Sequence, residues 1–419
     1  MAFERKKRKI KINTPKIKVK DDKSKTNETS QIEEETYQPS RVEIIKGSRR
    51  KRRIIRIGFY VLFLAVIITL IILNSMSATG LVEMIQNGYA KSGKGDFPVS
   101  IYSQNPTAFY TVNDTVNVLN DSYFEVYNSK GKLIQAASHG MSNPVLEISK
   151  ARFLLFDRGR YTVKIYNYSS FLSEKSFEKQ IFSAAIGRNG TYAVVTASDS
   201  YYATVYVYNK DDDLIYTWNS ANYYVSDVAV SNDGKSIALS LIGAEGGTFV
   251  SQVYILKYNS ATPVFKFTFN ALITSLMSAN ENYFLATGTD SAYTVSWNSS
   301  HSNDLGITGT VRAYRSSDSG RSIITYGRTN NDQINTVKII DTAGNSVSSF
   351  DFNSAIDDIG INETEVIVLS DHTVSVFDKN CTQIKELQSD VKPLRAVITQ
   401  LGSIITVDNS FMQRLSESE

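Results

Sequence analysis

Hydrophobic and polar positions alternate along most of the chain after Pro98, in units of about forty residues. Each unit opens with a polar turn followed by an apolar strand, as in Asn189-Gly-Thr-Tyr-Ala-Val-Val. About a dozen residues later comes an alternating strand that ends in Asn or Asp, as in Val207-Tyr-Asn209. Period-two alternation of β-branched and aromatic residues predicts β-strands, and Asn-Gly or Asp-Gly turns join such strands into hairpins.

The apolar strand after the polar turn recurs eight times, and equivalent positions lie 37 to 47 residues apart. A repeat near forty residues with four short strands per unit predicts a β-propeller, in which radially arranged sheets leave few open edges. Eight repeats predict an all-β, eight-bladed propeller, and seven blades remain the alternative if the irregular unit around residues 243–252 is not a blade. The equivalent positions are Val116, Phe153, Ala193, Ile237, Phe284, Ile323, Val366 and Ile404.

The two ends of the repeat region predict how the ring closes. Three strands are expected near the C-terminus, at residues 394–398, 404–407 and 411–415. A fourth strand is expected at residues 98–103, just before the first full unit. We therefore expect one blade to be shared between N- and C-terminal strands, because sharing closes the ring without an open edge.

A continuous apolar segment precedes the repeats. Residues 57–73 are broken only by one glycine and one threonine, and the nearest charge before them is Arg56. A helix of about 20 residues spans the roughly 30 Å core of a bilayer and satisfies its own backbone hydrogen bonds there. The segment therefore predicts a transmembrane signal anchor at residues 54–76. A buried core helix and a cleaved signal peptide are the alternatives, but the run has no polar face and is too long for a leader.

Charge is distributed unevenly on the two sides of this segment. The chain has 419 residues, with 45 basic and 42 acidic residues and a net charge of +3. Residues 1–53 hold 18 basic and 8 acidic residues, which gives a net charge of +10. The region after Arg56 holds 26 basic and 34 acidic residues, which gives a net charge of −8. Since basic flanks stay in the cytoplasm, the charges predict a plasma-membrane protein with a cytoplasmic N-terminus and an extracytoplasmic propeller.

These features divide the chain into four predicted parts. Residues 1–53 are rich in Lys, Glu, Ser and Thr and should form a disordered basic cytoplasmic tail. Its basic clusters could contact anionic lipids, although their main expected role is to set the topology. The anchor at residues 54–76 is followed by a juxtamembrane linker at residues 77–95 and by the propeller at residues 96–419.

The order of these segments resembles a known family. A basic tail and a single anchor are followed by Gly93-Lys-Gly-Asp-Phe-Pro-Val99, which opens the propeller, and the Asp233-Gly-Lys turn is similar to the turn of many propeller repeats. Together they resemble a family of uncharacterised single-span proteins of Gram-positive bacteria with extracytoplasmic propellers. The resemblance covers about residues 50–419, although a further glycine that often precedes the aromatic of the opening motif is absent. It implies the same topology and fold, and it implies no catalytic residues.

Motifs for catalysis and metal binding are lacking in the sequence. A single cysteine, Cys381, excludes an intramolecular disulfide and a multi-thiolate zinc site, and only three histidines are available. The Asp211–Asp213 run lacks the ligand spacing of a calcium loop and is predicted to be a hairpin turn. The Ser316–Ile323 segment, which superficially fits an Asp-box, is also predicted to be a hairpin turn. We expect no enzyme activity, no cofactor and no metal ion. Nucleic-acid binding is not expected, because no aromatic residues interleave with the basic clusters.

Aromatic residues provide the candidate binding surface. In a propeller, loops between second and third strands share a face with loops that join neighbouring blades. One tyrosine pair is predicted in a loop of each kind, a tryptophan leads into the second loop, and two arginines lie on the equivalent loop of the preceding blade. Stacked rings beside hydrogen-bond donors suit glycans or peptides, and the alternative is that the tyrosines only cover blade edges. The candidate residues are Tyr201, Tyr202, Tyr223, Tyr224, Trp218, Arg158 and Arg160.

A ring of loops without a catalytic set favours a membrane-anchored binding or scaffold module of the cell envelope. Its expected partners are the membrane that it spans once and an envelope protein, peptide or glycan. One alternative is an envelope hydrolase or lyase, which would need carboxylates that converge in three dimensions. The other is a transmembrane sensor subunit, whose tail would have to recruit an output domain.

Overall fold

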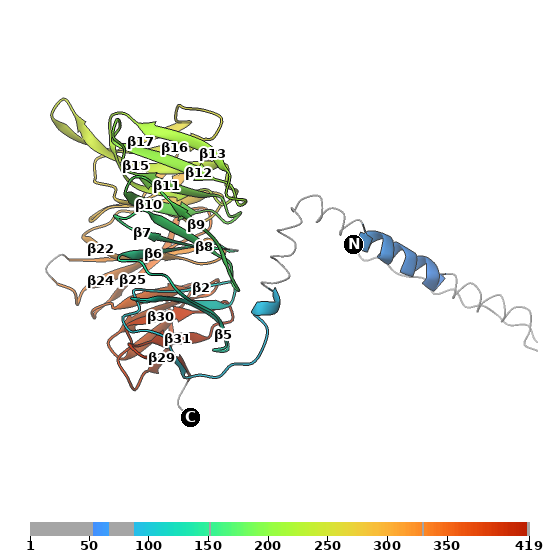
Figure 1. Ribbon diagram of the computed structural model, residues 1–419. Coiled ribbons are helices and arrows are strands. Elements are labelled where there is room, and N and C mark those ends of the chain that lie inside the picture. Colours follow the sequence, from blue (N-terminus) through green and yellow to red (C-terminus); the bar gives the residue numbers. More distant parts are fainter. Residues whose placement is uncertain (1–52, 67–87, 151, 329–330, 417–419) are drawn as a thin grey trace, which may run out of the picture. The chain divides into compact units, whose positions relative to one another are not determined.

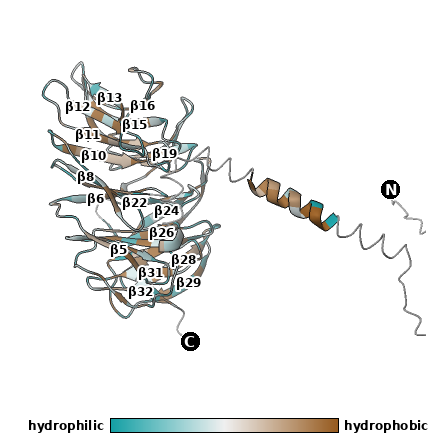
Figure 2. Ribbon diagram, turned by 45° about the vertical axis from the view of Figure 1, so that its right-hand side comes forward, coloured by the Kyte–Doolittle hydropathy of each residue, from teal (hydrophilic) through white to brown (hydrophobic). Residues whose placement is uncertain are grey.

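The computed structural model comprises two units, residues 1–75 and residues 76–419, each with its own internal contacts. In the first unit residues 53–66 form a helix, mostly hydrophobic in Figure 2. Within the described ranges, no helix is both long and apolar enough to cross a membrane. The predicted tail up to residue 52 and the rest of the predicted anchor, residues 67–76, lie outside those ranges. The structure describes residues 53–66, 88–150, 152–328 and 331–416.

The described part of the second unit folds into eight four-stranded antiparallel sheets (Figure 1). The eight-bladed propeller predicted from the repeats is therefore confirmed. The irregular unit around residues 243–252 is a true blade with a long central hairpin, so the seven-bladed alternative is wrong. All eight equivalent apolar positions lie within the first two residues of the second strand of a blade, and they are buried.

The blades follow one another in chain order, with the first strand of each blade nearest the axis. Blade 1 comprises β2 (Ala108–Val112), β3 (Thr115–Leu119), β4 (Tyr123–Asn128) and β5 (Leu133–Ser138). Blade 2 comprises β6 (Pro144–Ile148), β7 (Phe153–Asp157), β8 (Thr162–Tyr166) and β9 (Phe171–Ser176). Blade 3 comprises β10 (Ile181–Ile186), β11 (Tyr192–Thr196), β12 (Ala203–Tyr208) and β13 (Leu214–Ser220). Blade 4 comprises β14 (Tyr224–Val230), β15 (Ser236–Glu245), β16 (Thr248–Lys257) and β17 (Phe265–Phe269).

The second half of the ring repeats this order. Blade 5 comprises β18 (Ser275–Ser278), β19 (Tyr283–Thr287), β20 (Ala292–Ser296) and β21 (Ser302–Asp304). Blade 6 comprises β22 (Thr310–Ser316), β23 (Ser322–Gly327), β24 (Asn335–Ile340) and β25 (Ser346–Phe352). Blade 7 comprises β26 (Asp358–Ile361), β27 (Glu365–Ser370), β28 (Thr373–Asp378) and β29 (Gln383–Gln388). Blade 8 comprises β30 (Arg395–Ile398), β31 (Ile404–Val407), β32 (Phe411–Leu415) and, from the other end of the repeat region, β1 (Val99–Ser100).

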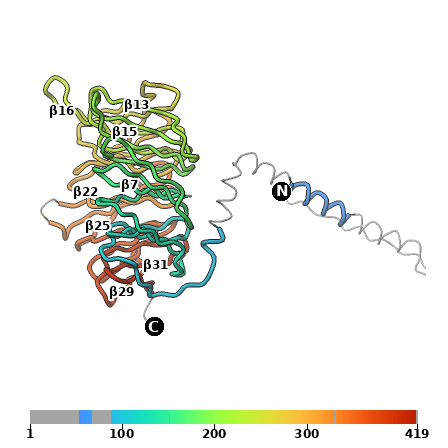
Figure 3. Tube along the Cα trace, viewed as in Figure 1, coloured from blue at the N-terminus to red at the C-terminus, as the bar shows by residue number. Residues whose placement is uncertain are grey.

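Blade 8 confirms the predicted closure of the ring. β1 pairs antiparallel with β32, so that Val99 lies opposite Met412. In Figure 3 the blue-green start of the propeller accordingly lies beside the red C-terminal strands. Eight hydrophobic clusters fill the gaps between neighbouring blades, and the cluster that contains Met412 joins blade 8 to blade 1. The interior is therefore continuous around the ring.

In blades 1, 3, 6 and 7 the Asn or Asp that ends the alternating strand caps the turn to the outermost strand. In blade 3 the Asn209 Oδ1 accepts backbone N–H groups of Asp211 and Asp213, both at 2.9 Å. Asn128, Asp341 and Asp378 make the same pairs of bonds in their own blades. A side chain that satisfies two turn amides is a local reason for this recurring residue. The Asp211–Asp213 run is thus a hairpin turn, as predicted.

The N-terminal segment of the propeller unit docks against blade 1. The Asn128 side-chain amide donates to the carbonyls of Lys91 and Gly93, at 3.2 and 3.1 Å. The Lys132 ammonium donates to the carbonyl of Ser92 at 2.9 Å. A Cβ at Gly95 would lie only 2.1 Å from the Lys132 backbone nitrogen, so this approach requires glycine. The described part of the predicted linker is therefore packed on the face that carries the turns between third and fourth strands.

Candidate functional site

The predicted tyrosines lie on the face that carries the loops between second and third strands. Tyr201 and Tyr202 end the β11–β12 loop, and Tyr224 begins β14 after the loop that joins blades 3 and 4. Their exposed fractions are 45%, 43% and 60%. The rings of Tyr202 and Tyr224 meet edge to face with centroids 4.7 Å apart (interplanar angle 73°). We call Tyr201, Tyr202 and Tyr224 the tyrosine surface.

Two of the predicted aromatic residues do not belong to this surface. Tyr223 is 8% exposed and packs in the cluster between blades 3 and 4. Its hydroxyl donates to Glu245, and this bond together with burial raises the pKa of Tyr223 to about 12. Trp218 is half-buried against the same cluster, and its indole N–H donates to the carbonyl of Ala261 at 3.1 Å. Both side chains hold neighbouring blades together.

A groove lies beside Tyr201, with a volume of about 540 Å³. Its walls come from blade 3 and from the segment after the outermost strand of blade 2. Phe177 and Tyr206 form an aromatic wall with centroids 5.7 Å apart. The Lys179 ammonium and the Asp199 carboxylate form an ion pair at 2.7 Å. Sequence reasoning missed these four residues because the groove is formed by segments of two blades.

The predicted arginines lie in the β7–β8 loop of blade 2, and both are exposed. The Arg158 guanidinium carbon lies 5.6 Å from the ring centroid of Phe156. Arg158 lines a second and larger cavity on the propeller axis, whereas Arg160 lines neither cavity. The structure therefore separates this pair of residues from the groove beside the tyrosine surface.

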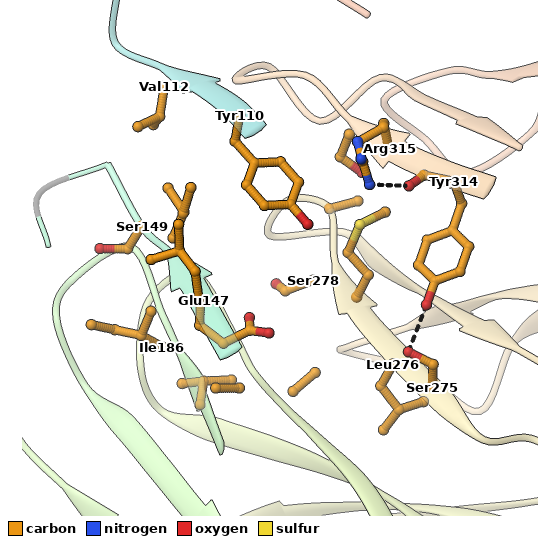
Figure 4. A pocket seen from close by; sticks show the side chains of 18 of the residues that line it. Tyr110, Val112, Glu147, Ser149, Ile186, Ser275, Leu276, Ser278, Tyr314 and Arg315 are labelled. Carbon is orange, nitrogen blue, oxygen red and sulfur yellow. Dashed lines mark hydrogen bonds between the residues drawn. The ribbon is translucent and has the colours of Figure 1, made fainter. Parts of the chain in front are cut away.

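The second cavity occupies the axis and has a volume of about 590 Å³. The first strand of every blade contributes to its lining, and each of these eight strands contributes at least one polar or charged side chain. We call it the axial cavity; Figure 4 shows part of its wall. The residues in question are Tyr110, Glu147, Ser183, Asp227, Ser275, Tyr314, Arg315, Asp358 and Arg395.

Two aspartates in this wall connect neighbouring blades. Asp227 of blade 4 accepts the Ser183 hydroxyl of blade 3 at 2.5 Å and the Leu276 backbone N–H of blade 5 at 2.8 Å. Asp358 of blade 7 accepts the Ala396 backbone N–H of blade 8 at 3.1 Å. Burial raises the pKa of both carboxyl groups, and the hydrogen bonds oppose that rise.

Arg315 neutralises one of these aspartates and also reaches across the axis. Its guanidinium lies 3.3 Å from the Asp358 carboxylate. The guanidinium carbon lies 4.7 Å from the ring centroid of Tyr110, which belongs to blade 1 and is not a neighbour of blade 6. Beside it, the Tyr314 hydroxyl donates to the Ser275 hydroxyl at 2.7 Å (Figure 4). These contacts tie blades 5, 6, 7 and 1 together around the cavity.

Glu147 differs from the other acids in the wall. It lies in β6, half-buried, and its carboxylate points into the cavity in Figure 4. No hydrogen bond or ion pair joins this carboxylate to any other described residue. Burial, and to a smaller extent the nearby Asp227, raise the pKa of Glu147 to about 8, although Arg158 opposes the shift.

One mouth of the axial cavity is bridged by turns between first and second strands. Asp318 of blade 6 accepts the Asn113 backbone N–H of blade 1 at 3.0 Å and the Gln400 side-chain amide of blade 8. The Arg188 guanidinium of blade 3 donates to the carbonyls of Asp318 and Ala279, at 2.8 and 3.3 Å. The Ser316–Ile323 segment is thus a turn, as predicted, and its Asp318 is the centre of this bridge. The other mouth opens on the face of the tyrosine surface, where Arg158 lies.

Comparison with known sequences places the propeller in a family. Residues 98–415 match the model of a family described as "Family of unknown function (DUF5711)". The chain belongs to this DUF5711 family. No curated protein matches its sequence.

Solved structures with the same fold share little sequence with this DUF5711 chain. Sqt1 from Saccharomyces cerevisiae is 10% identical, with a TM-score of 0.54 over 77% of this chain and 99% of that chain. The C-terminal WD40 domain of Sif2 is 12% identical, with a TM-score of 0.52 over 78% and 100%. BamB from Moraxella catarrhalis is 9% identical, with a TM-score of 0.48 over 77% and 98%. At such identities the likeness to Sqt1 and to the Sif2 domain establishes the propeller fold alone.

Within the described residues no group of three His, Cys, Asp or Glu side chains could hold a metal ion. His139 is buried and bonded to backbone groups of Asn120 and Met141, so it belongs to the core. Glu147 is the functional candidate that the sequence analysis missed. Its only signal is a carboxylate in an otherwise apolar first strand, Pro144–Ile148.

Proposed function

We propose that this protein is a membrane-anchored extracytoplasmic propeller that binds a cell-envelope component through its tyrosine surface. The observation that most supports this is the Tyr202–Tyr224 pair, in which two large rings contact each other and remain about half exposed. Rings held in place by each other lose little conformational entropy when they are covered, and aromatic residues are enriched at protein interfaces. The pair is therefore well suited to anchor a partner.

The long hairpin of blade 4 extends this surface. β15 and β16 pair from Ser236 as far as Glu245, opposite Thr248, and the hairpin projects beyond its neighbours in Figure 3. Near its tip Phe249 is 55% exposed. One exposed aromatic side chain near the tip of a projecting hairpin, together with the tyrosine surface, favours a protein surface as partner, with a peptide or a glycan as alternatives.

The entry of the chain leaves the tyrosine surface uncovered. The segment that contains Lys91 and Gly93 docks on the turn after Asn128, which lies on the opposite face of the ring. The described part of this segment therefore does not compete with a partner for the tyrosine surface.

The proposed location rests on the sequence preceding the propeller. The apolar run at residues 57–73 follows the basic stretch that ends at Arg56. Positive flanks stay in the cytoplasm, so this order supports a cytoplasmic N-terminus and an extracytoplasmic propeller. Membership of a single-span, Gram-positive family belongs to the same proposal.

A hydrolase on this scaffold is less well supported. Hydrolysis by paired carboxylates requires two acids that can exchange protons with a substrate. In the axial cavity Asp227 and Asp358 are already held by donors from neighbouring blades, and Glu147 is left as a single acid. This division of roles supports binding rather than catalysis.

Photo-cross-linking in living cells tests the proposal. The full chain is expressed with p-benzoylphenylalanine at Tyr224 or, as a matched control, at Phe171, an exposed aromatic after a turn on the opposite face. We expect irradiation to attach an envelope component to the chain labelled at residue 224 and not to the control. Cross-links from residue 171 with none from residue 224 would contradict the proposal.

A further inference from the structure

The basic and acidic side chains of the axial cavity differ in whether they have hydrogen-bond or ion-pair partners. Arg188 donates to two backbone carbonyls, and Arg315 pairs with Asp358. The guanidinium groups of Arg312 and Arg395 also donate to backbone carbonyls. In contrast, Glu147 points into the cavity and has no hydrogen-bond or ion-pair partner among the described residues. The fold therefore leaves an acid in the wall available to a ligand.

We propose that the axial cavity is a second binding site, which takes the ammonium group of a small organic ligand with the Glu147 carboxylate as its counter-ion. A charged group removed from water needs a partner of opposite charge or good hydrogen bonds, and the described wall supplies neither to this carboxylate. An ammonium group supplies both, because it carries one positive charge and three N–H donors. The proposal concerns a site separate from the tyrosine surface and does not depend on it.

The groups that face Glu147 favour a cation over other occupants. Asp227 of β14, in blade 4, adds negative potential at Glu147, and its own oxygens already accept hydrogen bonds from blades 3 and 5. Tyr110 of β2 presents a hydroxyl toward the same space in Figure 4, and this hydroxyl can accept an N–H. Arg158, near the open mouth, is the one opposing positive charge on Glu147. An ammonium group deep in the cavity with a polar or acidic end near Arg158 satisfies all four groups.

The shape of the cavity limits the size of this ligand. A volume of about 590 Å³ falls within the range of pockets for small molecules. Because the Asp318 turn bridges one mouth, the ligand must enter from the face of the tyrosine surface. A polymer chain therefore cannot thread the ring, and a small molecule or the free end of a longer one can enter.

Binding of a cation must be coupled to loss of a proton. The pKa of Glu147 lies near 8, so this carboxyl is mostly protonated at pH 7, and an ammonium ligand selects the ionised form. The apparent affinity should therefore rise up to tenfold per pH unit between pH 6 and 8. It should level off above pH 8 and fall again above about pH 10, where a primary amine itself loses its proton.

Isothermal titration of the purified full chain in detergent tests the site, with 1,5-diaminopentane as probe and pentane-1,5-diol as its neutral counterpart. We expect the diamine to bind, with a five- to tenfold gain in affinity from pH 6 to pH 7 and release of close to one proton at pH 7. Glu147→Gln should weaken binding at least tenfold. The matched control Asp357→Asn removes an acid of the same wall that already has Lys392 within 4.0 Å, and it should change the affinity less than threefold.

Three results would overturn the inference. The first is equal binding of the diol, which would make the cavity a polyol site. The second is an equal loss of affinity in the two variants, which would mean attraction by general negative potential. The third is the absence of diamine binding at pH 8 in a chain whose melting curve shows it folded. A Tyr202→Ala/Tyr224→Ala variant should bind the diamine normally, which separates this inference from the proposed function.

Discussion

At the residue scale, the axial acids show how neighbouring donors decide what a carboxylate does. Asp227 and Asp358 each accept a backbone N–H from the next blade, so their charge is used to hold the ring together. Glu147 receives no such donor, and burial leaves it protonated near neutral pH. The carboxyl groups of the two aspartates are therefore structural, whereas the carboxyl group of Glu147 is available to a ligand.

The state of Glu147 predicts the pH dependence of stability. Its pKa is about 8 in the folded chain against 4.5 in the unfolded one, so its contribution is fully present below pH 4.5 and is lost as the pH rises through 8. At pH 9 Glu147→Gln should therefore be more stable than the natural protein, by roughly 2 kcal/mol, a value discounted for contact with cavity solvent. Urea unfolding at pH 5, 7 and 9 measures this, with the exposed Asp211→Asn as control. Parallel pH profiles for the three proteins would show that Glu147 is ionised in the folded state.

The two neighbouring tyrosines show what the sequence reveals and what it does not. Loop topology correctly predicted that Tyr202 and Tyr224 come together. Tyr223 and Tyr224 then face opposite sides, because successive side chains alternate in extended chain, and Tyr223 is the one that enters the core. Which of the two tyrosines faces the core could not be predicted without knowing the residue at which β14 begins. Glu147 was missed for a different reason, since only the ring brings its neighbours Tyr110 and Asp227 to it.

At the element scale, a two-residue strand completes the ring. β1 contributes only Val99 and Ser100 to blade 8, and its partner strand β32 carries the fully buried Met412. That side chain packs in the cluster between blades 8 and 1. The blade repeat was readable in the sequence because buried second strands recur, and the shared blade followed from counting strands at the two ends.

Closure predicts unequal costs for two substitutions in blade 8. Met412→Ala leaves a cavity at the junction of the first and last blades and should lower the free energy of unfolding by about 3 kcal/mol. Leu401→Ala removes a side chain that is 82% exposed and should change it by less than about 0.5 kcal/mol. Chemical denaturation of both variants checks this. Equal stability of the two would mean that the junction does not hold the ring closed.

At the scale of the whole molecule, the two faces of the propeller ring differ in what they carry. One face carries the docked segment around Lys91 and the bridge at Asp318, and it is closed. The other carries the tyrosine surface, the blade 4 hairpin and the open mouth of the axial cavity. Both proposed sites are thus reached from one side, which is the side away from the chain's entry.

The basic stretch that ends at Arg56, just before the apolar run, predicts a definite membrane topology. A reporter that is active only outside the cytoplasm should work when fused after Glu419, and protease added to intact protoplasts should spare an N-terminal tag. The reason is the basic stretch before the apolar run, which should stay in the cytoplasm. Destruction of the N-terminal tag in intact protoplasts would reverse the orientation.

The affinity of the cross-linked partner for tyrosine variants tests the central claim most directly. Tyr202→Ala/Tyr224→Ala should weaken binding about thirtyfold, because removing a buried interface aromatic costs about 2 kcal/mol or more. Phe171→Ala and Asp211→Ala, on the opposite face, should leave the dissociation constant within twofold, and all variants should keep the melting temperature of the natural protein. Unchanged affinity in the double tyrosine variant, with the fold intact, would contradict the account.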